Sequence, residues 1–358
     1  MELQRVEVAR SPVSATTGNP DNLPMSSKRP RGRPPKTPAT CLKAKFWYLI
    51  VDSLGWKKWR SAYGREKHYS ASARKLAAEG RSPLRGDKVW VPSNKARKHQ
   101  NGVLASPDHI AEVDLEFPGT ARLTTIPHWE IMDVPAPSVE RLRELLTGLR
   151  PGIVEILFRR DANDRWQRRL DMQRTLRRLD RESDFDALVA CLGLMRELEA
   201  SDCRIDIAYF DVAVAIRRIF MRLAATAPFS DFAPTLLTYL RTHFLKENYG
   251  SWSLGIDDIA EHLADHRELR HGVILMAEDL FLIDLAERDA LGCLYVADRL
   301  GITNVFEKLW HYTFKVADWR TCKQDPLLKV FVRRFRRLTP KNAPFALLED
   351  IYEKQMRR

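Results

Sequence analysis

Apolar residues recur at helical spacing along most of the chain, from about Ser138 to the C-terminus. In "DVAVAIRRIFMRLA", apolar positions repeat every three or four residues and arginines occupy the opposite side, which predicts an amphipathic helix facing a core. We therefore expect one all-α domain over residues 138–358. Similar stripes occur in "DFDALVACLGLMRELEA", "FAPTLLTYLRTHFLKE", "ERDALGCLYVADRLG", "NVFEKLWHYTFKVADW" and "PLLKVFVRRFRRL".

Start and stop signals place the first of these helices. Ser138 stands where an N-cap is needed and Glu140 follows it in the first turn. Gly148 and Pro151 come after the last apolar position, "LL" at 145–146, and typically end a helix. The pattern predicts a helix between Ser138 and Gly148.

Residues 1–137 differ in composition from the helical part. Residues 1–40 are rich in Pro, Ser, Thr, Gly and Asn and poor in large apolar residues, so we expect a disordered tail. Residues 41–95 are rich in aromatic and basic residues and predict a small module, with a helix in "SASARKLAAEGRSP" and a strand in "KVWVPS". Residues 96–137 predict a linker with short β-like segments, as in "ARLTTIPHWEIMDV". The predicted fold class is mainly α.

The charge distribution separates the two parts of the chain. Residues 1–100 hold 22 Lys and Arg against 7 Asp and Glu, whereas residues 101–358 hold 37 against 40. The whole excess of +12 therefore comes from the first hundred residues. Such an asymmetry indicates a nucleic acid or an anionic membrane as partner for the basic part.

The cysteine and hydropathy patterns indicate the cellular compartment of the protein. The 5 cysteines are scattered and contain no C-x-x-C pair, which argues against a disulfide framework and a zinc knuckle and favours a reducing compartment. No apolar run reaches the ~18 residues that a membrane span needs. The N-terminus lacks the apolar core of a secretory signal. We expect an intracellular protein, in the cytoplasm or nucleoid of a bacterium or in a nucleus, without a membrane partner.

The most specific motif is "SSKRPRGRPPKTP", at residues 26–38. Its Pro-Arg-Gly-Arg-Pro centre resembles an AT-hook, the minor-groove DNA-binding motif of high-mobility-group A proteins. The resemblance covers residues 28–36 only, and it implies binding to A·T-rich double-stranded DNA. The residues that it implicates are Lys28, Arg29, Pro30, Arg31, Gly32, Arg33, Pro34 and Lys36.

The chemistry of these residues agrees with that resemblance. The minor groove is ~6 Å wide, and its negative potential over A·T tracts attracts arginine. Gly32 has no Cβ, so the backbone can approach the groove floor while Arg31 and Arg33 extend along it. Flanking lysines would contact phosphates without reading sequence. A solvated basic tail or a nuclear import signal is the alternative interpretation of the same run.

A second DNA contact is expected in residues 41–95. Lys57, Lys58 and Arg60 lie among Trp56, Trp59 and Tyr63, a mixture that suits phosphate contact with base stacking. The competing interpretation is that most of these aromatic residues form the core of the module and the cations are solvated around it. We favour the core interpretation for most of the aromatics and expect the basic surface to face DNA.

Motifs of enzymatic chemistry are scarce. The sequence has no glycine-rich phosphate loop, no G-x-S-x-G and no H-E-x-x-H. His262 and His266 lie four residues apart, with Asp258 one turn earlier, a spacing at which a metal would be shared on one helix face. Without a second cluster we interpret them as a polar helix face. We predict no metal and no cofactor.

Two arginine-rich runs remain. "FRRDANDRWQRRLDMQRTLRRLDRE" mixes acids with its arginines, and we predict a solvated helix whose charges neutralise locally, with an apolar seam at Trp166, Leu170, Leu176 and Leu179. "FVRRFRRL" contains no acid and is the better candidate for an accessory basic patch.

These patterns predict a non-enzymatic, regulatory or DNA-organising protein. The hook and the basic module would hold A·T-rich DNA, and residues 138–358 would bind a protein partner or self-associate. Two alternatives stay open: a DNA-acting enzyme or enzyme subunit with its active site in the helical domain, and a helical interaction scaffold that is merely localised to DNA.

Overall fold

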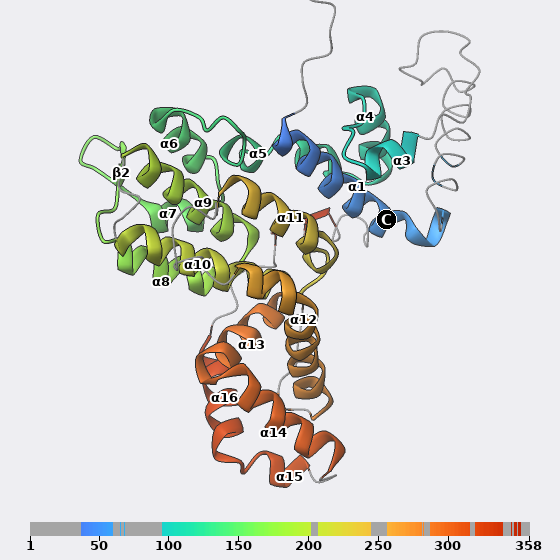
Figure 1. The fold of residues 1–358 in the computed structure, drawn as a ribbon, viewed down its shortest axis with the longest axis vertical. Helices are drawn as coiled ribbons and strands as arrows, with labels where there is room; N and C mark the ends of the chain where they lie inside the picture. Colours follow the sequence, from blue (N-terminus) through green and yellow to red (C-terminus); the bar gives the residue numbers. More distant parts are fainter. Residues whose placement is uncertain are drawn as a thin grey trace, which may run out of the picture. The chain divides into compact units, whose positions relative to one another are not determined.

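The structure is a computed structural model of the chain. It describes residues 37–59, 65, 68, 95–201, 207–244, 256–280, 282, 287–315, 319–338, 345, 347–348 and 350–351. These residues form a mainly α-helical fold, which confirms the predicted fold class (Figure 1). Among them, no helix is both long enough and apolar enough to span a lipid bilayer.

The helices gather around two hydrophobic clusters, both within the compact unit Lys36–Arg358. The first cluster takes side chains from the elements before residue 245 and from residues 345, 348 and 351. The elements before residue 245 are α1 (Pro38–Trp59), α3 (Lys95–Gln100), α4 (Pro107–Glu116), η1 (Thr120–Thr124), α5 (His128–Ile131), α6 (Val139–Thr147), α7 (Pro151–Leu157), β1 (Phe158–Arg160), β2 (Trp166–Arg168), α8 (Met172–Glu182), α9 (Phe185–Ala200), α10 (Ile207–Leu223) and α11 (Phe229–His243). All of them except α3 and β2 contribute buried side chains to this cluster.

The second cluster is smaller and lies among the later helices. Its fully buried members include Val273, Cys293, Leu309 and Phe331, each from a different helix. The helices concerned are α12 (Ile256–Asp279), α13 (Glu287–Leu300), α14 (Ile302–Phe314), α15 (Trp319–Cys322) and α16 (Pro326–Arg337). The chain thus builds two cores within one compact unit.

The cap residues predicted for α6 and the apolar stripe predicted for α10 are found in the structure. Ser138 caps α6 by accepting a hydrogen bond from the Arg141 amide at 3.2 Å, and Gly148 follows as its C-cap. In α10 the apolar stripe is buried: Val212, Ile216 and Ile219 have at most 1% of their surface exposed. Both helices therefore follow directly from periodicity and capping.

Aromatic residues of α1 enter the first cluster. Phe46 is fully buried and its ring lies 5.0–5.7 Å, centroid to centroid, from the rings of Trp129, Phe185, Phe229 and Phe232. This confirms the core interpretation for the aromatic residues at 46–48, which are all buried. It also joins α1 to the helical body, whereas the sequence placed residues 41–95 in a module of their own.

Residues 96–137 differ from the prediction. Instead of a linker with β-like segments, they form α3, α4, the 3-10 helix η1 and α5. Ser106 caps α4, and the Asp114 carboxylate accepts hydrogen bonds from the Gly119 and Ala121 amides, which fixes the turn into η1. Trp129 donates to the Leu123 carbonyl at 2.6 Å inside the core. The Ser106 cap and the hydrogen bonds of Asp114 are local contacts that periodicity does not register, whereas η1 and α5 have no side-chain cap.

The arginine-rich run 158–182 is also corrected. Its first half is a β-hairpin, in which Phe158 pairs with Arg168 and Arg160 with Trp166. Asp161 holds the turn by accepting hydrogen bonds from the Asn163 and Arg165 amides. Only the second half, α8, is a helix. The predicted apolar seam therefore splits: Leu176 and Leu179 are buried, whereas Trp166 and Leu170 are exposed.

His128 is buried against the first cluster. His128 packs against the ring of Phe185 at 4.9 Å, and its Nε2 lies 3.5 Å from a carboxylate oxygen of Asp186. Neither ring nitrogen has a hydrogen-bond partner among the described residues. Burial lowers the pKa of His128 below its ordinary value of 6.5, and the charge of Asp186 opposes that shift.

We expect this histidine to weaken the protein in acid. Between its lowered pKa and 6.5 the unfolded chain binds more protons at this residue than the native state, so its contribution to the free energy of unfolding falls as the pH drops below 6.5. His128→Phe removes the titrating group and keeps a ring of similar size. Urea unfolding from pH 8 to pH 5 should show the wild type losing stability relative to the variant below pH 6.5. Parallel profiles would contradict the assignment.

Candidate anion-binding pocket

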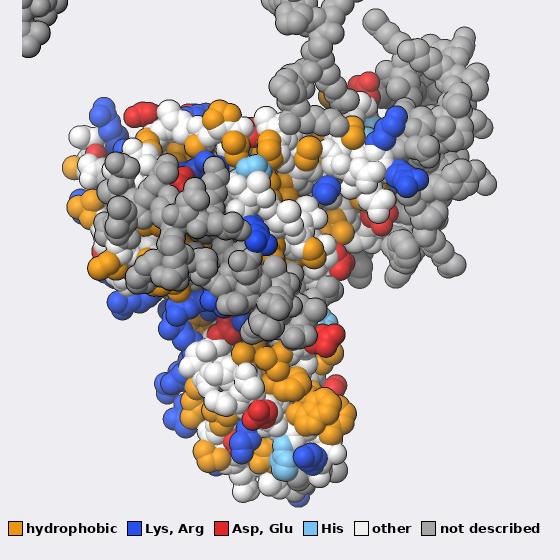
Figure 2. All heavy atoms as spheres, viewed as in Figure 1, with side chains coloured by type: hydrophobic (Ala, Val, Ile, Leu, Met, Phe, Trp, Pro, Cys, Tyr) orange, Lys and Arg blue, Asp and Glu red, His pale blue; other side chains and the backbone are white. Residues whose placement is uncertain are grey.

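A pocket of about 560 Å³ lies between α8, α13 and α16. Arginine is its dominant side chain, and three apolar or aromatic residues complete the lining. Figure 2 shows Lys and Arg side chains gathered along the side of the molecule where α8 lies near α13 and α16. The lining residues are Arg174, Arg177, Arg178, Arg181, Arg299, Arg334, Arg337, Tyr295, Val296 and Leu338.

Four of the arginines come from one face of α8. They stand at positions 174, 177, 178 and 181, which is helical spacing, and all four are exposed. Leu176 and Leu179 occupy the opposite face and are buried in the first cluster. The amphipathic pattern of α8 therefore turns its arginines outward into the pocket.

Helix α16 supplies two more arginines. Its N-cap, Asp325, accepts hydrogen bonds from the Leu327 and Leu328 amides, and the buried Phe331 fixes which face turns inward. Arg334 and Arg337 then lie in the last turn of the helix. Cations are favourable there because they oppose the negative end of the helix dipole. The run "FVRRFRRL", predicted as an accessory basic patch, thus forms one wall of the pocket.

Helix α13 connects the pocket to buried charges. Arg299 donates to a carboxylate oxygen of Asp180 at 3.1 Å and lies 5.4 Å from the centre of the Tyr295 ring. Arg222, buried behind it, lies 4.9 Å from the same ring. Burial by itself would lower the pKa of Arg299, but the charges and hydrogen bonds of Tyr295 and Asp180 raise it above its ordinary value. Arg299 is therefore charged and paired with a buried carboxylate, while 44% of its side chain stays exposed.

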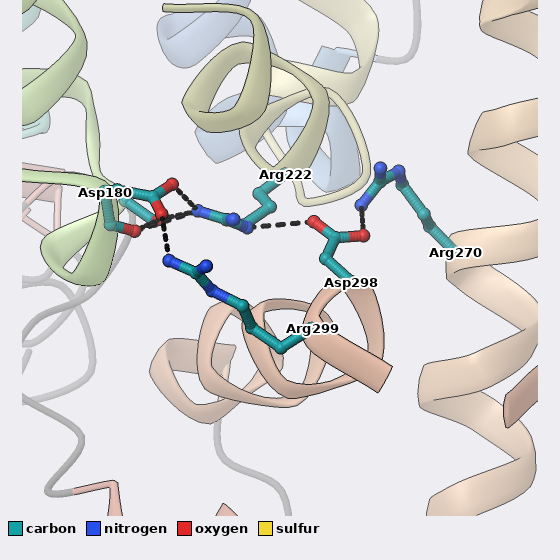
Figure 3. Close-up of polar contacts among 6 residues, drawn as sticks. Asp180, Arg222, Arg270, Asp298 and Arg299 are labelled. Atoms are coloured by element: carbon teal, nitrogen blue, oxygen red, sulfur yellow. Dashed lines mark hydrogen bonds and ion pairs between the residues drawn. The ribbon is translucent and has the colours of Figure 1, made fainter. Parts of the chain in front are cut away.

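Beneath the pocket lies a chain of ion pairs (Figure 3). Arg222, on α10, donates to Asp180 of α8 at 2.8 Å and to Asp298 of α13 at 3.0 Å. Asp298 also accepts from Arg270 of α12 at 2.8 Å. The network links α8 and α10, in the first cluster, to α12 and α13, in the second.

The acids of the arginine-rich run do not neutralise the arginines of α8, contrary to the prediction. Asp180 pairs with Arg222 and Arg299, and Glu182 with Arg150 at 2.9 Å. Asp171 is used as the N-cap of α8. Among the described residues, no acidic side chain forms an ion pair with the remaining pocket arginines, which are Arg174, Arg177, Arg178, Arg181, Arg334 and Arg337.

This arrangement has a clear chemical consequence. Like charges three and four residues apart on a helix repel and destabilise it by about 0.2–0.5 kcal/mol per pair. Arginine keeps its charge at any physiological pH, so the cluster cannot relieve itself by losing protons. An anion with several oxygen atoms relieves the repulsion and accepts bidentate hydrogen bonds. The pocket is therefore suited to phosphate groups.

The side chains predicted to contact DNA are not among those that the structure describes. The hook residues Lys28–Pro34 and Lys36, and Arg60 of the basic module, fall outside the described residues. Lys57 and Lys58 belong to α1, but their side chains are also outside the description. Their DNA contacts remain predictions.

The candidate metal ligands stay untested. Asp258, His262 and His266 lie along α12, in the part of that helix whose side chains are not described. Among the side chains that are described, no group of three or more His, Cys, Asp or Glu residues is arranged to hold a metal ion.

Comparison with known proteins adds no assignment. No protein-family model, curated protein or solved structure matches this chain.

Proposed function

We propose that this chain is a DNA-binding protein with two separate contacts. The hook at residues 28–36 holds the minor groove of A·T-rich DNA, and the arginine pocket holds phosphate groups. The observation that carries the proposal is the pocket itself: seven arginines from three helices line one cavity, and six of them have no acidic partner among the described residues.

The charge distribution supports two contacts rather than one. The first hundred residues carry a net charge of +15, while residues 101–358 carry −3. A basic pocket in an otherwise acidic part of the chain is a local concentration of charge, not a by-product of composition. A single hook binds weakly because it is ordered on docking, so a second contact on the same DNA raises the overall affinity through effective concentration.

The test separates the two contacts by two double variants. Arg31→Ala/Arg33→Ala removes the groove-reading arginines, and Arg177→Gln/Arg178→Gln removes two pocket charges from an exposed helix face. We expect the first variant to lose preference for A·T over G·C duplexes. The second should weaken both duplexes about equally, by roughly tenfold, and reduce the salt slope of log K by about one for each phosphate that is no longer neutralised. Fluorescence anisotropy across a salt series measures both effects.

A charge-matched control is available in the hairpin. Arg159→Gln/Arg165→Gln also removes two exposed arginines, but neither lines the pocket. It should leave both affinity and preference near wild type. If the pocket variant binds like this control, the pocket is not a DNA contact. If the hook variant keeps its A·T preference, the hook part of the proposal is wrong.

A further inference from the structure

The pocket is an open hollow of limited size. Its arginines line a volume of about 560 Å³ rather than a flat basic face. That volume falls within the range of about 300–1,000 Å³ that is typical of small-molecule sites. The ligand is therefore expected to enter the cavity with a compact end.

The lining is divided between two chemistries. The arginines supply charge, whereas Tyr295, Val296 and Leu338 supply an aromatic and aliphatic surface within the same pocket. Val296 is only 2% exposed and belongs to the second cluster, so it supports this surface from within the core, and the half-buried Tyr295 and Leu338 form its accessible part. A ligand that matches both parts carries phosphate at one end and a flat or apolar group at the other.

One arginine of the pocket, Arg299, is 44% exposed but already has a buried partner. Arg299 pairs at 3.1 Å with Asp180, whose side chain is 4% exposed and is also held by Arg222 at 2.8 Å. Because Asp180 is fixed on both sides, Arg299 is oriented before any ligand arrives. Such preorganisation lowers the entropy lost on binding.

We propose that the pocket binds a nucleotide through a terminal, monoester or polyphosphate, group. The phosphate lies among the arginines, and the sugar and base lie against Tyr295 and Leu338. This inference rests on the proposed phosphate-binding role of the same pocket. The ligand is either a free nucleotide or the 5′-phosphorylated end of a DNA strand, which present the same chemistry.

A terminal phosphate suits the pocket better than a backbone diester does. A monoester carries about −1.5 to −2 charges near pH 7 and three free oxygen atoms, whereas a diester carries one charge and two free oxygen atoms. Several arginines that lack acidic partners in the described structure favour the higher charge in one place. Their planar guanidinium groups each donate two parallel hydrogen bonds to such a group.

The test compares a 3′-labelled dT12 strand with a 5′-phosphate against the same strand with a 5′-hydroxyl, using fluorescence anisotropy with the full chain. The phosphorylated strand should bind roughly tenfold more tightly or better, since it adds charged hydrogen bonds. Arg177→Gln/Arg178→Gln should abolish that difference, and Arg159→Gln/Arg165→Gln should retain it. The advantage should also shrink from pH 7.5 to 5.5, because the second pKa of the phosphate is about 6 whereas arginine does not titrate.

Competition by dTTP and by inorganic tripolyphosphate identifies the source of the ligand. Both sources support the inference: displacement by dTTP at concentrations where tripolyphosphate does not compete indicates a free nucleotide, and a phosphate-dependent preference without competition indicates a strand end. If tripolyphosphate competes as well as dTTP, the apolar wall has no role and the nucleotide assignment is wrong. If both strands bind equally and the pocket variant weakens both, the pocket holds diesters and only the proposed function survives. If the pocket variant changes neither strand, both proposals fail.

Discussion

Arg222→Met is expected to lower the free energy of unfolding by about 3–5 kcal/mol, because it leaves buried carboxylates without their counter-charge. Arg222 is 1% exposed and donates to Asp180, Ser183 and Asp298 at once. Among the described residues, Asp180 would then keep the partly exposed Arg299 as its one cationic partner, and Asp298 would keep Arg270. Urea unfolding monitored by circular dichroism measures the loss.

Two companion variants sharpen this experiment. Arg218→Met changes an exposed residue on the same helix and should alter stability by no more than about 0.5 kcal/mol. Arg222→Lys keeps the charge, but a single ammonium cannot reproduce the fork that reaches both carboxylates, so an intermediate loss is expected. A wild-type free energy of unfolding in Arg222→Met would show that the network does not stabilise the native state.

Phe46→Ala is expected to cost about 3–5 kcal/mol, the range found when a buried phenylalanine is truncated. Its ring contacts four other aromatic rings from α5, α9 and α11, so the deletion leaves a cavity that its neighbours cannot all fill. Because α1 shares this core, the loss should appear as a lower midpoint of the main unfolding transition followed by helical circular dichroism.

The control for this prediction is Leu170→Ala. Leu170 is 92% exposed, so its truncation should change stability by no more than about 0.5 kcal/mol. If Phe46→Ala instead melts a minor part of the signal and leaves the main transition unchanged, residues around Phe46 fold as a module apart from the rest.

Helices α6 and α10 were predictable because their signals are local. The Ser138 cap and Gly148 bound α6, and the apolar stripe of α10 matches its buried face. The elements at 95–131 were not predicted, and the turn into η1 depends on specific hydrogen bonds that the Asp114 carboxylate accepts from the Gly119 and Ala121 amides. An element of four to six residues is too short to show the repeat of apolar residues that marks a helix.

Only part of the pocket could be predicted from the sequence. The run "FVRRFRRL" was recognised as basic, and the arginines of α8 already stand at helical spacing. The sequence does not show which way the neighbouring acidic side chains point. Asp180 turns inward to Arg222, which lies 42 residues away along the chain, and that long-range pairing leaves the surface arginines of α8 without a counter-charge from it.

The return of the chain to the first cluster after α16 governs how the protein would bear a mechanical load. Phe345, Leu348 and Ile351 pack into the same core as α1, so both ends of the described chain belong to the first cluster. The second cluster is formed by the part of the chain between these ends. A pulling force applied at residues 37 and 351 would load the first cluster and bypass the second. The helices that carry Arg299 and Arg334 would feel tension only after the first core had opened.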